Sequence, residues 1–206
     1  MIYRRRLPLL LCLFIAGCQT AGPGSSLPKN DIRQHRIVET QVRGIENIFA
    51  WPREEENFAN SSPAAKEALE QHGLKPSGQL PGLREQLQTA MTSLVDRQVS
   101  NVLGSELKGP RPVKLVLTIQ TFDIPSPVRR TFVDQHAKFQ ATIDLVDVRT
   151  GETLSTYAGS QRAQFMLGGL GGLIAVAARP ELKDVSESLV GDYMRAYKAW
   201  LLKTQP

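Results

Sequence analysis

Cysteine is almost absent from this sequence, which has two among 206 residues, at positions 12 and 18. From Gln19 onward there is no thiol, so disulfide bonds, thiolate catalysis and cysteine metal sites are excluded there. Histidine is also sparse, because His35, His72 and His136 lie far apart and lack the spacing of a zinc site. Neither a Gly-x-Ser-x-Gly elbow nor a phosphate-binding P-loop occurs. The sequence therefore offers no recognisable catalytic or metal-binding motif.

Long apolar runs are lacking as well. Leu7–Ile15 is a run of nine residues that contains Pro8, and the apolar, glycine-rich Phe165–Ala178 has 14 residues. A membrane-spanning helix needs about 17–25 residues. Neither run is long enough to predict a transmembrane segment.

The first 18 residues have the parts of an export signal. Arg4–Arg6 precede the apolar run Leu7–Ile15, and Ala16-Gly17 lead directly into Cys18. A basic segment, a short apolar segment and small residues at the cleavage site are typical of a secretory signal. We weighed an uncleaved transmembrane anchor, a cytosolic protein with an apolar start, and twin-arginine export, and each fits the length or order of these segments less well.

The tetrapeptide Ile-Ala-Gly-Cys, which ends at Cys18, resembles the lipobox of bacterial lipoproteins. The resemblance implies that residues 1–17 are removed together with Cys12, and that Cys18 becomes an acylated first residue held in the lipid bilayer. Gln19 takes the place of the aspartate that usually retains lipoproteins at the inner membrane. The resemblance therefore implies that the protein is anchored to the periplasmic face of the outer membrane.

The excess of basic residues is concentrated in the signal. The whole chain has 25 Lys and Arg against 20 Asp and Glu. Removing Arg4–Arg6 leaves 22 against 20, a net charge of +2. A net charge this small does not favour binding to the nucleic-acid backbone, so we expect no nucleic-acid partner.

The sequence after the signal predicts a flexible tether followed by one domain. Residues 18–35 are expected to form a lipidated flexible tether, because Gln19–Gln34 lacks periodicity and contains glycine, proline and serine. Residues 36–206 are expected to form a single globular domain. The acidic run Glu54-Glu55-Glu56 could be a cation site, but we favour the start of a helix, where negative charge meets the helix dipole. Ser62-Pro63 then predicts a cap for a short helix that ends at Gly73.

Hydrophobic periodicity predicts the other elements. Steps of three, four and seven from Leu83 to Val102 predict an amphipathic helix of about five turns, begun by Pro81-Gly82 and ended by Gly104. Alternation of apolar and polar residues predicts strands, and a second helix should follow a cap at Asp184. The predicted strands are 36–44, 113–122, 136–148 and 153–160. The fold class is thus α+β, a three- to four-stranded, mainly antiparallel sheet with two main helices on one face, in the order β-α-β-β-β-α.

Two segments are candidate partner contacts. Arg129 and Arg130 lie in a long connection between strands, where they could meet phosphate or carboxylate groups, although solvated arginines are the simpler interpretation. Leu170 and Leu173 lie in the glycine-rich run Phe165–Ala178, which does not fit a nucleotide cradle. That run is either a bend with a short buried helix or an exposed apolar loop that meets a partner or membrane, and we favour burial.

The chemistry of the remaining polar residues does not predict an enzyme. Asp134 and His136 form an acid–histidine neighbourhood with no evident nucleophile. Asp144 and Asp147 should lie on opposite faces of one strand, so their carboxylates could not act together as an acid–base pair. We therefore expect no catalytic residue, no metal site and no cofactor.

The order of elements behind a lipobox looks like that of small periplasmic lipoproteins that accompany envelope transport and assembly. The segment Asp147–Leu154, read as Asp-x-x-Thr-Gly-Glu-x-Leu, resembles that of lipoproteins of unknown function of alphaproteobacterial type. Our first hypothesis is a non-enzymatic accessory lipoprotein that docks onto an envelope protein. A carrier of lipid or lipopolysaccharide, or a cell-envelope hydrolase, remains as an alternative.

Overall fold

The computed structural model describes residues 29–126, 129, 136–164 and 185–203. Among these residues, no helix is both long enough and apolar enough to cross a membrane. The first part of the chain forms α1 (Lys29–Ile32), β1 (His35–Arg43), η1 (Ile45–Asn47), β2 (Ile48–Ala50), α2 (Pro52–Ala59), α3 (Pro63–His72) and η2 (Ser77–Gln79). It continues with α4 (Pro81–Leu103), β3 (Arg111–Asp123), β4 (His136–Asp147), β5 (Thr153–Gln164) and α7 (Val185–Lys203).

The five described strands form one mixed sheet in which the order is β1-β3-β4-β5, with β2 also paired to β3. The three strands β3, β4 and β5 form the predicted antiparallel meander. The sheet is mostly antiparallel, as predicted, but both β1 and β2 run parallel to β3. The physical reason is the connection: β1 and β3 are joined through α4, and such a crossover returns the chain in the same direction.

The sequence predicts at most four strands, and the described residues contain a fifth, the short strand β2. Ile48 and Ala50 of β2 pair with Phe122 and Asp123 at the end of β3. A corner at Gly44 separates β2 from β1. Gly44 has φ 79°, and a Cβ there would collide with the main-chain oxygen of Ile119, so this corner requires glycine.

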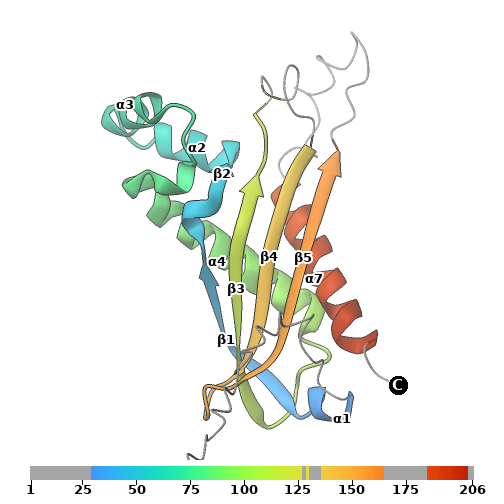
Figure 1. Cartoon of the computed structure of the whole chain (residues 1–206). Helices are drawn as coiled ribbons and strands as arrows, with labels where there is room; N and C mark the ends of the chain where they lie inside the picture. The colour runs from blue at the N-terminus through green and yellow to red at the C-terminus, as the bar shows by residue number, and fades with distance from the viewer. Residues whose placement is uncertain (1–28, 127–128, 130–135, 165–184, 204–206) are drawn as a thin grey trace, which may run out of the picture.

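Both long helices cover one face of the sheet (Figure 1). The predicted apolar stripe of α4 is confirmed, although the helix has 23 residues and is longer than the five turns expected. Its fully packed residues are Leu83, Leu87, Met91, Leu94, Val95, Val99 and Leu103. The opposite face of β4 carries the polar side chains, so the fold is α+β with helices on one side of the sheet, as predicted.

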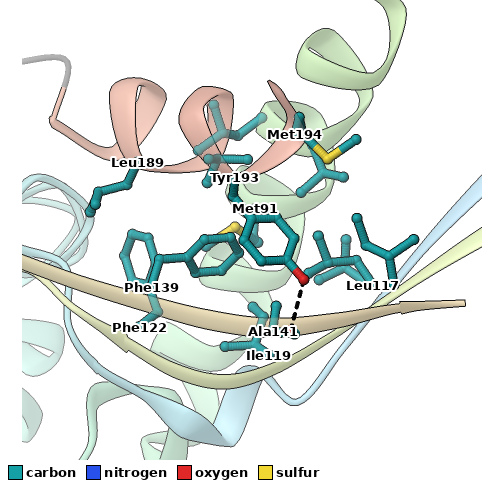
Figure 2. Close-up of a cluster of buried hydrophobic side chains, with 14 of the residues drawn as sticks. Met91, Leu117, Ile119, Phe122, Phe139, Ala141, Leu189, Tyr193 and Met194 are labelled. Atoms are coloured by element: carbon teal, nitrogen blue, oxygen red, sulfur yellow. Dashed lines mark hydrogen bonds between the residues drawn. The ribbon is translucent and has the colours of Figure 1, made fainter. Parts of the chain in front are cut away.

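A chain of aromatic rings runs through the core between the sheet and α7. Phe139 of β4 lies with its ring centroid 5.8 Å from Phe122 and 4.9 Å from Tyr193. The Tyr193 hydroxyl donates a 2.7 Å hydrogen bond to the main-chain oxygen of Ala141 (Figure 2). The tyrosines of α7 belong to this core, because Tyr193 and Tyr197 are both 0% exposed.

The short elements before α4 also follow from local sequence. The Ser62 side chain accepts a hydrogen bond from the Ala65 amide, and Pro63 begins α3, so the predicted cap is confirmed. The structure places α1 inside the segment that the sequence assigns to the tether, and Ile32 of α1 is buried in the core. The cap at Asp184 and the glycine-rich run 165–178 lie outside the described residues.

Candidate functional site

Arg129 is the one predicted partner-contact residue that the structure describes. Its guanidinium forms two hydrogen bonds of 2.9 Å with the two carboxylate oxygens of Asp123, at the end of β3. Asp123 is buried, and its carboxylate neutralises the charge of Arg129 through this bidentate ion pair. The pair fixes the start of the β3–β4 connection. Arg130, Leu170, Leu173 and the lipidation residue Cys18 lie outside the described residues.

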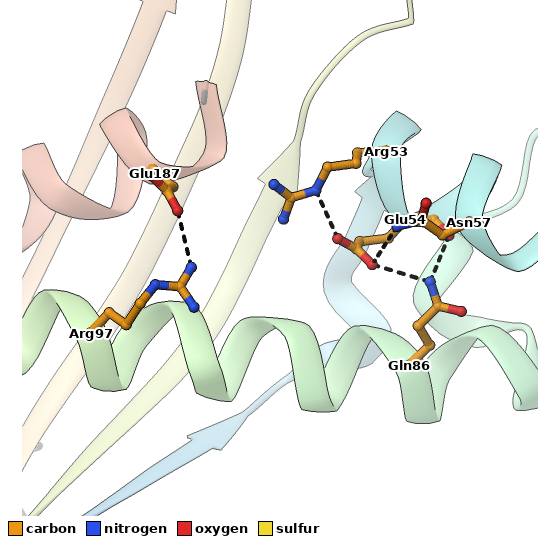
Figure 3. Close-up of polar contacts among 6 residues, drawn as sticks. All are labelled: Arg53, Glu54, Asn57, Gln86, Arg97 and Glu187. Carbon is orange, nitrogen blue, oxygen red and sulfur yellow. Dashed lines mark hydrogen bonds and ion pairs between the residues drawn. The ribbon is translucent and has the colours of Figure 1, made fainter. Parts of the chain in front are cut away.

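The acidic run at 54–56 begins a helix, as we favoured. Glu54 and Glu55 stand in the first turn of α2, and Glu55 accepts a 3.0 Å hydrogen bond from the main-chain amide of Trp51. Glu54 is buried and accepts from the Arg53 guanidinium at 2.9 Å and from the Gln86 amide at 3.1 Å (Figure 3). The Gln86 amide also bonds the main-chain oxygen of Glu54. Glu54 therefore ties α2 to α4 as a structural carboxylate.

The polar groups considered for chemistry are dispersed and engaged within the fold. His72 is hydrogen bonded at 2.9 Å to the Pro76 oxygen, and Asp144 accepts a 2.6 Å hydrogen bond from Thr156. Burial raises the pKa of the Tyr193 and Tyr197 hydroxyls well above the ordinary tyrosine value, so both stay neutral. In the part of the chain that the structure describes, no group of three His, Cys, Asp or Glu side chains is placed to hold a metal ion. Asp134, the predicted neighbour of His136, lies outside it.

The end of the domain at which the described chain begins is built from three segments distant in sequence. The main-chain oxygens of Gln34 and His35 accept 2.8 Å hydrogen bonds from the amides of Arg111 and Gly109. Arg111 in turn forms an ion pair of 3.7 Å with Asp147, which precedes the β4–β5 turn. We call this end, formed by residues 31–36, 106–111 and 147–152, the N-terminal pole.

Two acids of the N-terminal pole, Asp147 and Glu106, are held by partners. Asp147 is buried and accepts hydrogen bonds from the amides of Arg149 and Thr150, at 2.8 and 3.1 Å. These two bonds, more than the neighbouring arginine charges, lower the pKa of Asp147 below the ordinary aspartate value. The hydrogen bond from Lys198 likewise lowers the pKa of Glu106. Asp147 thus fixes the turn that the sequence motif Asp147–Leu154 contains.

We predict that Asp147→Asn lowers the free energy of unfolding in a pH-dependent way. The folded pKa of Asp147 lies below its unfolded value of about 3.9. The stabilisation by the carboxylate is therefore complete above that value and is lost as the pH falls through the folded pKa. Urea unfolding of both proteins should show the largest difference near neutral pH and a shrinking difference below about pH 4.

The control for this prediction is Glu152→Gln, which removes an exposed carboxylate from the same turn. This variant should unfold like the unchanged protein at each pH, because surface substitutions usually change stability by less than about 0.5 kcal/mol. A difference between Asp147→Asn and the unchanged protein that stays constant from neutral to acidic pH would contradict the assignment.

A surface groove of about 300 Å³ lies between β1 and α4. Ile37 and Leu103 line it together with the acidic side chains Glu39 and Asp96. The interior between the sheet and the helices is instead filled by the buried core side chains of β3, β4, α4 and α7. The groove is open and rimmed by acids, which suits neither a lipid chain nor a phosphate group.

No protein-family model matches this chain, and no curated protein matches it. Several solved structures resemble it weakly. A candidate lipoprotein from Caulobacter crescentus CB15 has 17% identity and a TM-score of 0.36, and the match covers 53% of this chain and 79% of that one. A PelC dodecamer from Paraburkholderia phytofirmans has 11% identity and a TM-score of 0.37, with 84% and 93% covered. Lipoprotein GNA1162 from Neisseria meningitidis has 15% identity and a TM-score of 0.25, with 72% and 96% covered.

Two of these three structures carry the word lipoprotein in their descriptions. All three TM-scores lie below 0.5, so the similarities assign neither a family nor a function to this chain. The function of this chain has to be inferred from its sequence and from the geometry of the described residues.

Proposed function

We propose that this chain is a lipoprotein anchored through acylated Cys18 to the periplasmic face of the outer membrane. There it acts without catalysis, as an accessory factor that docks onto an envelope protein of a transport or assembly system. The observation that carries the proposal is the order of Arg4–Arg6, Leu7–Ile15 and Ala16-Gly17-Cys18. Gln19, in place of aspartate, supports the outer rather than the inner membrane.

The described domain supports binding over catalysis. Several of its charged groups hold the fold: Arg129 bonds Asp123, Glu54 joins α2 to α4, and Asp147 holds a turn. A lipid carrier would need an apolar cavity, whereas the described space between the sheet and the two long helices is filled. These contacts favour docking over the carrier and hydrolase alternatives.

Chemical crosslinking in intact cells tests this function. The acylated protein is recovered from membranes through a C-terminal affinity tag, and Cys18→Ala serves as the matched control. We expect the same envelope protein in replicate recoveries and at least about tenfold less of it with the control, because the anchor raises the effective concentration of the domain at the membrane. Recovery of no reproducible partner, or equal recovery with the control, would contradict docking.

A further inference from the structure

The N-terminal pole carries exposed positive charge. Its five exposed basic side chains come from β1, β3 and three connections, and they are Arg33, Arg36, Lys108, Arg111 and Arg149. Hydrogen bonding brings them to one end of the sheet: Arg36 forms a β-bridge with Lys108, and Arg111 lies opposite His35. Arg149 stands in the β4–β5 turn, beside Asp147, and the amide of Val148 bonds the Pro112 oxygen.

The acidic side chains at this pole balance little of that charge at the surface. Asp147 is buried beneath Arg111 and Arg149, and Glu106 is paired with Lys198 at 2.9 Å. Only Asp31 and Glu152 are exposed acids there, among the described side chains. Within these segments the exposed side chains number five basic and two acidic, because Glu106 and Asp147 are not exposed. The exposed surface of the pole is therefore predominantly basic.

The same pole is the end from which the chain leads back to the anchor. The described chain begins at Lys29 of α1, at the same end of the sheet as the start of β1 and the β4–β5 turn (Figure 1). The 11 Cα–Cα steps from Cys18 to Lys29 span at most about 40 Å when fully extended. The 13 residues of β3 rise over about the same length, about 40 Å. Attachment at one end of an elongated sheet favours an orientation in which that end lies nearest the lipid.

We propose that the N-terminal pole docks on the anionic phospholipid headgroups of the membrane that holds the anchor. This inference rests on the proposed lipid anchor and adds an orientation to it. Arginine and lysine side chains near a negatively charged membrane surface are attracted to it within about one Debye length, which is about 8–10 Å at physiological salt. Docking of the pole directs the α2–α3 end of the domain away from the bilayer, toward the periplasm (Figure 1).

The test measures the orientation of the acylated protein on vesicles. Since Cys12 leaves with the signal and Cys18 is acylated, a single introduced cysteine is the only free thiol. Thr153→Cys places a fluorophore at the pole, and Leu74→Cys places one at the opposite end, where Leu74 is 99% exposed. Energy transfer is measured to a headgroup-labelled lipid, in vesicles of phosphatidylcholine alone and of phosphatidylcholine mixed with phosphatidylglycerol.

On the phosphatidylglycerol vesicles we expect transfer from Thr153→Cys to exceed transfer from Leu74→Cys by about twofold or more, and the excess to fall at high salt. The charge reversal Arg33→Glu/Arg36→Glu/Lys108→Glu should abolish that excess. The matched control Arg43→Glu/Lys66→Glu/Arg162→Glu changes the net charge equally but uses exposed cations outside the pole, and it should retain the excess. Circular dichroism checks that both variants are folded.

Three outcomes would overturn the proposal. The first is equal transfer from the two labelled positions on phosphatidylglycerol vesicles. The second is an equal effect of the pole variant and the matched control. The third is failure of the protein to float with vesicles of either composition, which would remove the anchor itself and so is distinguishable from loss of orientation alone.

Discussion

Replacing Cys18 with alanine should abolish acylation and with it the lipid anchor of the domain. The thioether that carries the acyl chains can form only on a cysteine sulfur, and Cys18 is the only cysteine that follows the signal. Each buried methylene of an acyl chain contributes about 0.8 kcal/mol to membrane binding, so two or more chains give a stable anchor. Without them the domain has no described helix that could hold it in a bilayer. The effect should therefore be close to complete.

Metabolic labelling with palmitate, followed by membrane fractionation, measures this effect. We expect an unlabelled, uncleaved precursor from Cys18→Ala. The matched control is Cys12→Ala, which removes the other cysteine but lies within the signal, and it should label and fractionate like the unchanged protein. Continued labelling of Cys18→Ala would remove the anchor assignment.

Truncation of Tyr193 should have the largest effect on the stability of the domain. The ring is 0% exposed and lies 4.9 Å from Phe139 and 5.5 Å from Tyr157, between centroids. Tyr193→Ala removes these contacts and leaves a cavity between α7 and β4, so we expect a loss of about 3–5 kcal/mol in the free energy of unfolding. Tyr193→Phe keeps the ring but deletes the hydrogen bond to the Ala141 oxygen, and should cost about 0.5–1.5 kcal/mol.

Urea unfolding followed by tryptophan fluorescence compares these variants, all in the same state of acylation. Trp51 is a suitable probe, because its ring is buried and lies 5.0 Å from Phe122. Leu74→Ala is the control, since an isolated, exposed side chain should change stability by less than about 0.5 kcal/mol. A loss for Tyr193→Ala no larger than that for Leu74→Ala would show that the aromatic cluster does not stabilise the domain.

The strands of the meander and the two long helices could be predicted because each has a clear period. Alternation along β4 and the stripe on α4 repeat over many residues, so the pattern stands out against chance. The direction of β1 could not be predicted in this way, because periodicity records which face is buried and carries no information about the partner strand. The three residues of β2 are too few to show a period at all.

The polar contacts between distant side chains could not be predicted from sequence patterns either. The bidentate pair of Arg129 and Asp123 joins a strand end to the connection that follows, and no spacing rule identifies it. The N-terminal pole is assembled from cations in three separate segments, each next to an acid, and the near-neutral net charge of the mature sequence conceals their clustering. The prediction for Cys18 depends instead on a local pattern, a few consecutive residues in a fixed order, and it stays a prediction.

The parallel pairing of β1 with β3 has a consequence for the time at which the domain can fold. The strands join residues 35–43 to residues 111–118, so the sheet has a high contact order and cannot close until β3 is present. A chain threaded through a translocation channel from its N-terminus would expose β1, α2, α3 and α4 long before the strand that completes them. Under the proposed route of export, folding would be deferred until most of the polypeptide has crossed, and the precursor would stay unfolded during translocation.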